Sequence, residues 1–228
     1  MCNLEVMYES LLAVRATSED LDVVNINEVM EDDEDEAIRI IDYGAFADND
    51  MTRVFMPDTV ISIRDEAFIG CLNLEEVMMP DSLLRIGERA FCDCENMKNV
   101  MLSKRLIAIE DEAFQNCSSV QFIDTYKHLE TIGAHAFSGM SSLEAVVLKE
   151  GLESIDNGAF ELCPRLETIK LPHSLKCLGY AVFQGDTSLV SFDYNGTIAD
   201  FNAIDKDADW LSNSNIKTIH CLDGNIEI

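Results

Sequence analysis

Apolar residues recur along this chain with a period of 23 residues. The dipeptide Ala-Phe marks almost every copy, with Val182 in place of alanine in the last one. The spacing is 22 residues once and 23 residues five times, for the phenylalanines Phe46, Phe68, Phe91, Phe114, Phe137, Phe160 and Phe183. A period this constant over seven copies is typical of a solenoid, in which stacked units contact only their neighbours.

Other apolar positions keep the same phase. A pair such as Leu83 and Ile86 precedes Ala-Phe, and a trio such as Leu74, Val77 and Met79 follows it. Each copy therefore reads L-x-x-I-x-x-x-A-F-x-x-C-x-x-L-x-x-V-x-L-P. The alternation of period two at its end, with β-branched residues, predicts one short strand per copy. Proline then stops this strand in three copies, because it cannot donate to a ladder.

The segment around Ala-Phe predicts a different conformation. Its apolar residues are three apart, which favours one helical turn per copy. Asp65, Glu88 and Asp111 lie just before that turn, where a carboxylate accepts hydrogen bonds from free N–H groups and meets the positive end of the dipole. Because equal positions stack, we expect a phenylalanine spine beside a row of small alanines.

This pattern resembles the BspA-like leucine-rich repeats of bacteria and some protists. The resemblance covers residues 38–194, and the tail with Trp210 and His220-Cys221-Leu222-Asp223-Gly224 is similar to the C-terminal capping segment of bacterial members. It implies an α/β repeat solenoid, a right-handed curved horseshoe with a concave parallel sheet and short helical turns on the other side. It also implies surface display and binding of proteins or host components in many members, without catalytic activity.

The two ends differ in composition from the repeats, so we expect three parts. These are an acidic N-terminal helical cap at residues 1–37, seven repeats at 38–194, and a C-terminal cap at 195–228. One apolar helix face in the first part would cover the first repeat. That face consists of Leu4, Met7, Tyr8, Leu11 and Leu12.

Four of the eight cysteines share one column of the repeat. Cys71, Cys94, Cys117 and Cys163 lie three residues after a spine phenylalanine, and Met140 takes that place in the copy between. Neighbouring copies would be roughly 4.8 Å apart, which brings adjacent thiols near disulfide distance. The exchange with methionine instead favours reduced, buried thiols. A metal is less favoured, because one column offers no tetrahedral ligand set.

Charge excludes some partners. The 228 residues hold 43 Asp and Glu against 16 Lys and Arg, a net charge of −27. Such a polyanion repels phosphate backbones and anionic lipid, so we expect neither nucleic acid nor membrane insertion. The first fifty residues carry −13 of this charge. For the acidic run Glu31–Glu36 we favour a solvated loop, with a calcium site or a docking strip for a basic partner as alternatives.

Motifs for chemistry are missing from the sequence. It contains no dinucleotide-binding, P-loop or G-x-S-x-G pattern. The histidines fall in different phases of the repeat, at His128, His135, His173 and His220. We therefore predict no catalytic site, no metal site and no cofactor.

Location and function are open to two interpretations each. The N-terminus lacks a secretory signal and no apolar run reaches membrane length, so the default is a cytoplasmic protein, or a secreted or cell-surface one if a signal was removed. We favour a non-catalytic module that recognises a protein or peptide, with oligomeric state open. The alternative is a structural or adhesive segment of a bacterial surface protein without a discrete site.

The predicted binding face is the concave face of the solenoid, formed by the outward side of the strands. In each strand the residues that flank the buried valine or isoleucine point to solvent, and one column reads Phe55, Met78, Met101. Three exposed apolar side chains in a row often mark an interaction site. The candidate partner-binding residues are Arg53, Phe55, Glu76, Met78, Asn99, Met101, Phe122 and Val147.

Overall fold

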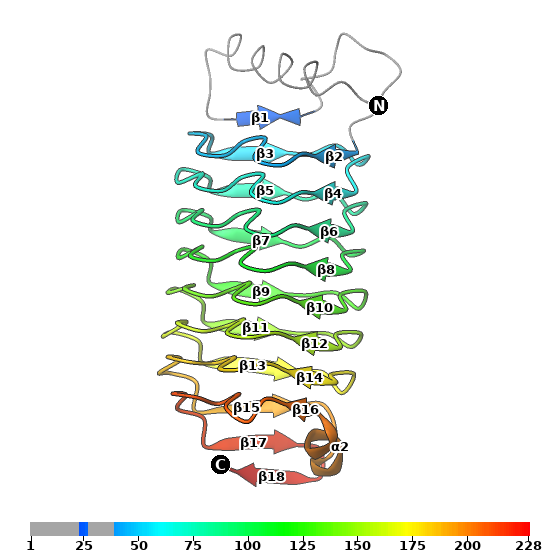
Figure 1. Cartoon of the computed structure of the whole chain (residues 1–228), viewed down its shortest axis with the longest axis vertical. Coiled ribbons are helices and arrows are strands. Elements are labelled where there is room, and N and C mark those ends of the chain that lie inside the picture. Colours follow the sequence, from blue (N-terminus) through cyan, green and yellow to red (C-terminus); the bar gives the residue numbers. More distant parts are fainter. Residues whose placement is uncertain (1–22, 27–38) are drawn as a thin grey trace.

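The chain folds as a solenoid whose turns are stacked along one axis (Figure 1). The structure is a computed structural model, and it describes residues 23–26 and 39–228. Each turn contributes one strand to each of two parallel ladders. The predicted repeat solenoid with a parallel sheet is therefore confirmed. The proposed helix at residues 4–12 and the acidic run at 31–36 lie outside the described residues.

The first ladder, here called the long-strand ladder, contains the strands predicted from the sequence and, at its two ends, strands that were not predicted. It falls into a four-stranded sheet, β1–β3–β5–β7, and a sheet that runs from β9 to β18. Its parallel strands are β1 (Val23–Asn25), β3 (Arg53–Phe55), β5 (Glu76–Met78), β7 (Asn99–Met101), β9 (Phe122–Asp124), β11 (Ala145–Val147), β13 (Thr168–Leu171), β15 (Ser191–Tyr194) and β17 (Thr218–Cys221). The antiparallel β18 (Gly224–Glu227) follows.

The second ladder, here called the short-strand ladder, was not predicted. Its eight strands have two residues each, and the second residue of most of them is the buried isoleucine or leucine that precedes Ala-Phe. The strands are β2 (Ile40–Ile41), β4 (Ser62–Ile63), β6 (Arg85–Ile86), β8 (Ala108–Ile109), β10 (Thr131–Ile132), β12 (Ser154–Ile155), β14 (Cys177–Leu178) and β16 (Asp205–Lys206).

The predicted columns fill the core between the ladders. The seven spine phenylalanines stack as nearly parallel rings, with centroids 5.0 to 6.1 Å apart. At the C-terminal end Trp210 contacts Phe183 edge to face at 6.5 Å and closes the spine. Alternate strand residues such as Val54 and Ile123 are fully buried beneath the long-strand ladder.

The Ala-Phe segments are turns and not the helical turns we expected. In each copy the residues two before and two after the spine phenylalanine have a left-handed backbone, for example Glu66 at φ 58° and Gly70 at φ 68° around Phe68. The N–H of Phe68 donates to the Ala90 carbonyl of the next turn at 2.8 Å. A helix would direct this N–H along its own axis. Hydrogen bonding between stacked turns therefore overrides the local helical propensity.

The acidic residues before these turns bond between turns. Asp65 Oδ1 accepts the Glu88 N–H at 3.0 Å, and Asp111 Oδ1 accepts the Ala134 N–H at 2.8 Å. They were predicted to accept from the start of their own turn. Glu88 contributes its backbone N–H to this contact.

Both ends of the repeat array extend further than its sequence pattern. At the start, β1 pairs in parallel with β3. At the end, β16 and β17 extend the two ladders by another turn. That turn carries the single helix of the described residues, α2 (Ile198–Ala203), whose first turn is closed by a reciprocal capping box between Thr197 and Asp200. The segment predicted as a C-terminal cap is thus built as one more turn.

Candidate binding surface on the long-strand ladder

The register of β3, β5 and β7 places three apolar side chains in one row. Phe55 lies opposite Met78, and Met78 lies opposite Met101. The exposed fraction is 49% for Met78 and 69% for Met101, whereas Phe55 is half-buried. We call this row the apolar stripe. It begins after Asn25 of β1, which lies opposite Phe55.

The stripe ends at a break in the ladder. Strands β7 and β9 are neighbours in the stack but belong to separate hydrogen-bonded sheets. Phe122, on the far side of this break, is 49% exposed. It occupies the first position of its strand, whereas Met101 occupies the last, so Phe122 lies diagonally beyond the stripe. The largest exposed apolar side chains of this face therefore gather on either side of the break.

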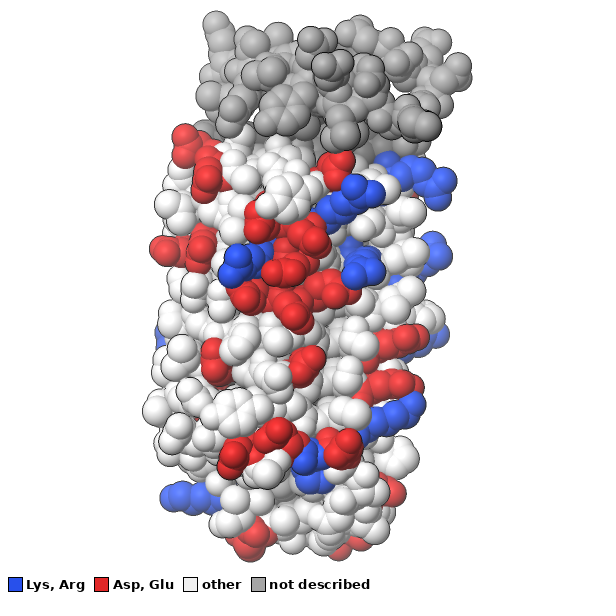
Figure 2. Space-filling view, in the orientation of Figure 1, with Lys and Arg blue, Asp and Glu red and all other residues white. Residues whose placement is uncertain are grey.

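Charged side chains border the stripe. Arg53 Nε lies 3.6 Å from Glu76 Oε2 in the neighbouring strand, and Lys98 Nζ lies 2.9 Å from Glu75 Oε2. In Figure 2 carboxylates gather over the region of β5 to β9, with a few lysines and arginines beside them. Such exposed pairs add little to stability. They form a polar rim around the apolar residues.

Two of the predicted residues lie apart from the stripe or add nothing apolar to it. Asn99 is exposed on β7 as predicted, and it lies opposite Glu76. Val147 is half-buried on β11 and lies opposite Asp124, which separates it from Met101 along the column. The Asp124 carboxylate in turn lies 2.8 Å from Lys149 Nζ. The structure thus gathers most of the eight predicted residues around β3–β9 and leaves Val147 outside.

The cysteine column is buried and its thiols are free. Cys94 Sγ donates to the Phe68 carbonyl oxygen at 3.2 Å, and Cys117 Sγ donates to that of Phe91 at 3.2 Å. Burial raises the pKa of the Cys117 thiol, so it stays neutral. These thiols therefore connect successive turns and take no part in surface chemistry.

The histidines do not form a catalytic relay in the described structure. His135 Nδ1 lies 2.8 Å from Glu161 Oε1, and Ser138 Oγ donates to the same oxygen at 3.3 Å. Serine and histidine thus share one carboxylate instead of bonding to each other, as a nucleophile and its base must. Among the described residues no three histidine, cysteine, aspartate or glutamate side chains converge as a metal site.

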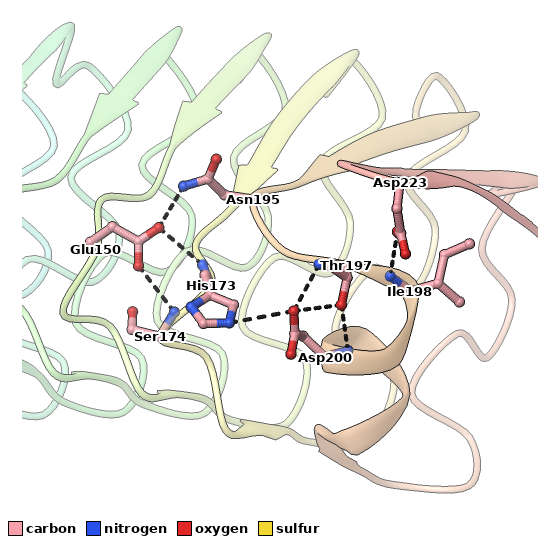
Figure 3. A network of polar contacts seen from close by, with 8 residues as sticks. All are labelled: Glu150, His173, Ser174, Asn195, Thr197, Ile198, Asp200 and Asp223. Carbon is pink, nitrogen blue, oxygen red and sulfur yellow. Dashed lines mark hydrogen bonds and ion pairs between the residues drawn. The ribbon is translucent and has the colours of Figure 1, made fainter.

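A polar junction at the C-terminal end was missed from the sequence. Glu150 accepts the backbone N–H groups of His173 and Ser174, each at 3.1 Å, and the Asn195 side-chain amide at 2.6 Å (Figure 3). His173 Nε2 lies 3.6 Å from Asp200 Oδ2 at the start of α2. The junction joins three successive turns to the capping helix. The same column of the repeat holds Asp58 and Asp81 in earlier copies, so the glutamate by itself gave no signal.

The described residues include no helix that is long and apolar enough to cross a membrane.

The two ladders, the phenylalanine spine and the exposed strand face define a leucine-rich-repeat solenoid. A family profile described as "BspA type Leucine rich repeat region (6 copies)" matches residues 39–138 and 108–228. The chain belongs to this family. The profile extends to the last residue and so includes the segment after 194. Leucine-rich-repeat proteins of this family are generally non-catalytic scaffolds.

Solved structures agree with this assignment. A leucine-rich repeat protein of T. pallidum is 25% identical, with a TM-score of 0.68, over 74% of this chain and 78% of that one. A leucine-rich repeat protein from Bacteroides ovatus is also 25% identical, with a TM-score of 0.64, over 89% of this chain. The match spans 64% of the Bacteroides protein. A search for similar curated proteins finds no match.

Proposed function

We propose that this protein is a non-catalytic binding module that recognises a protein or peptide through the long-strand ladder. The observation that carries the proposal is the apolar stripe, three side chains in strict register with Met78 and Met101 largely exposed. Exposed apolar side chains in a contiguous row are uncommon on a surface this rich in charge. Methionine adapts its shape to irregular partners.

The spacing of the stripe favours a helical segment of the partner. Successive turns here are about 5 Å apart, since the spine rings of the same turns have centroids 5.1 and 5.0 Å apart. Along a helix, residues i, i+3 and i+7 lie at about 0, 4.5 and 10.5 Å. Alternate residues of a strand are about 6.7 Å apart, so an extended segment would not match the spacing of the stripe. An amphipathic helix that lies along the stack therefore matches all three side chains.

We also propose that the module acts at a cell surface. Its support is the family, whose members are typically surface-associated. A signal peptide encoded upstream of residue 1 would support this location, and the detection of the native protein only in the cytoplasm would contradict it.

The binding proposal is tested with a pair of matched double variants. Met78→Asp with Met101→Asp places charge in the stripe, and Leu72→Asp with Leu162→Asp places the same charge at exposed leucines outside the ladders. Each chain is immobilised and used to capture proteins, which are identified by mass spectrometry and then purified. We expect at least one purified partner whose Kd rises about 30-fold for the stripe variant only, as is usual for the centre of an interface.

Two results would overturn the proposal. One is a set of partners whose Kd values are equal for both double variants. The other is weak binding that scales with the number of repeats and is insensitive to either change, which is the behaviour of an adhesive segment without a discrete site.

A further inference from the structure

The cysteine column ends in a buried aspartate. The position three residues after the spine phenylalanine holds Asn49 in the first copy, a thiol or a methionine in the next five copies, and Asp186 in the last copy. The Asp186 side chain has no exposed surface. Burying a carboxylate costs far more than burying a thiol, unless the charge is paired. The way in which Asp186 is accommodated therefore calls for a physical explanation.

Only one of the two carboxyl oxygens has a partner. Oδ1 accepts the backbone N–H of Cys163 at 2.8 Å. Oδ2 is buried and has no hydrogen-bond partner within the described part of the chain. A carboxylate has two acceptor oxygens, and one of them would be left unsatisfied here. A neutral carboxylic acid has an acceptor oxygen and an O–H donor, which suits a site that supplies one donor and one acceptor.

The equivalent thiols indicate where this acceptor lies. Cys163 Sγ donates to the Phe137 carbonyl oxygen at 3.3 Å, 26 residues earlier, as Cys94 and Cys117 do to their own phenylalanines. The residue 26 positions before Asp186 is Phe160, so the carbonyl oxygen of Phe160 is the equivalent acceptor. The carbonyl oxygens of earlier spine residues also accept the N–H of the next column residue, as Phe91 does from Cys94. At Phe160 this N–H, from Cys163, is directed to Asp186 instead.

We propose that Asp186 is protonated in the folded protein at neutral pH, donates its Oδ2–H to the Phe160 carbonyl oxygen, and acts as a pH-sensitive lock on the last turns. At alkaline pH the proton is released to solvent, and a buried carboxylate oxygen then faces a carbonyl oxygen. Repulsion between them opens the contact. The inference does not depend on the binding function, because Asp186 lies inside the solenoid.

The surroundings of Asp186 agree with this assignment. Burial raises its pKa to about 8, the Cys163 N–H opposes that rise, and the charge of Glu161 adds to it. The titratable groups that face Asp186 are Cys163 and Glu161, both from the preceding turn. Burial raises the pKa of the Cys163 thiol, which therefore stays neutral. Glu161 Oε1 lies 2.8 Å from His135 Nδ1, and the Glu161 side chain is partly exposed to solvent.

The direction of the pH effect follows from linkage. In the unfolded chain this carboxyl ionises near pH 3.9. Between that value and about pH 8 the folded state holds a proton that the unfolded state has lost. The stabilising contribution is therefore complete below about pH 4 and is lost as the pH rises to about 8. Within that window one proton corresponds to a change of about tenfold per pH unit in the folding equilibrium constant.

The test compares the full chain with Asp186→Cys, which restores the repeat pattern, and with Asp186→Asn, which cannot ionise. Urea unfolding is followed from pH 5 to pH 9. We expect the folding equilibrium constant of the native chain to fall relative to both variants, by about tenfold per pH unit up to about pH 8. A ratio that stays constant over this range would overturn the proposal.

Infrared spectroscopy of the unaltered chain provides a test that needs no variant to fold. The C=O stretch of a carboxylic acid is resolved from that of a carboxylate. We expect one such band at pH 7 that disappears reversibly near pH 8, together with faster hydrogen exchange in residues 182–213. A spectrum at pH 7 without any carboxylic-acid band would overturn the proposal.

Discussion

The ring of Phe91 lies on that of Phe68 with the centroids 5.0 Å apart and the planes within 2° of each other. Phe91 contacts Phe114 on its other side at 5.3 Å, so its removal leaves a void that spans two turn interfaces. We expect Phe91→Ala to lower the free energy of unfolding by about 3–5 kcal/mol. Urea unfolding followed by circular dichroism measures this loss.

A matched control for the spine is available on the surface. Phe122 is half exposed on the long-strand ladder, so Phe122→Ala should cost less than about 1 kcal/mol. Equal losses for the two variants would show that the phenylalanine stack is not the main source of stability.

Gly87 permits a close approach between two turns. A Cβ at this position would lie 2.7 Å from the Asp65 backbone nitrogen and 2.5 Å from Asp65 Oδ1. We expect Gly87→Ala to destabilise the protein by more than about 2 kcal/mol, because backbone cannot move aside in a stacked array. Asp65→Ala, which removes only the acceptor of the Glu88 N–H, should cost about 1 kcal/mol. Thermal unfolding of both variants provides the comparison.

The control for this steric effect is Gly44→Ala. Gly44 has a φ of +57°, but no non-neighbouring atom of residues 23–26 or 39–228 lies within 4 Å of the added Cβ. Its cost should be limited to the left-handed backbone, about 1 kcal/mol. If Gly44→Ala and Gly87→Ala were equally destabilising, backbone conformation and not contact between turns would explain both.

The polar junction should make the C-terminal end sensitive to acid. Burial raises the pKa of Glu150, but the hydrogen bonds from Asn195, His173 and Ser174 outweigh it and leave the pKa below its ordinary value. A lowered folded-state pKa means that the contribution is present above the unfolded value of about 4.3 and is lost as the pH falls through the folded value. Glu150→Gln should therefore destabilise the protein by about 1 kcal/mol at pH 7 and less at pH 3.

The comparison for Glu150 is Glu153→Gln. Glu153 forms an exposed pair with Lys176 at 2.6 Å, which should contribute less than about 0.5 kcal/mol at either pH. Unfolding curves at pH 3 and pH 7 distinguish the two variants. A loss for Glu150→Gln that did not change with pH would assign its role to packing instead of to charge.

Thiol alkylation should follow burial along the chain. Among the cysteines that the structure describes, Cys177 is exposed and is expected to react first, followed by the partly exposed Cys221. The column thiols of Cys71, Cys94, Cys117 and Cys163 are buried and should react only on unfolding. Mass spectrometry of peptides from iodoacetamide-treated protein measures each site, with and without urea. Rapid labelling of Cys117 in the native protein would contradict the buried column.

Columns and faces could be predicted from the sequence, because stacking turns one repeat into a periodic rule. Phe91, Val100 and Cys94 are all buried where their phase placed them, and Met78 and Met101 are exposed where the alternation placed them. The left-handed turns could not be predicted from local spacing. Residues such as Arg89, with φ 54°, disfavour that conformation on their own, and only hydrogen bonds to the next turn enforce it.

The ends of the array escaped prediction for a different reason. The turn built from β16 and β17 departs from the 23-residue spacing because α2 is inserted in it, so its residues fall out of phase with the template. Trp210 completes the spine without being a phenylalanine. The break between β7 and β9, beside the apolar stripe, has no signature in the sequence either, since both strands keep the repeat pattern.

One kind of hydrogen bond between turns occurs only at every second junction, and this limits how such a chain can lengthen by duplication. Asp65, Asp111 and Asn157 each accept the N–H of the following turn, and the glycines that make room for them, Gly87, Gly133 and Gly179, occur only in the turns between. The smallest unit that can be duplicated without disturbing a junction is therefore 46 residues and not 23. Duplication of the acceptor-bearing turn alone would set a side chain against an acceptor where a glycine is required, whereas duplication of the pair repeats every junction.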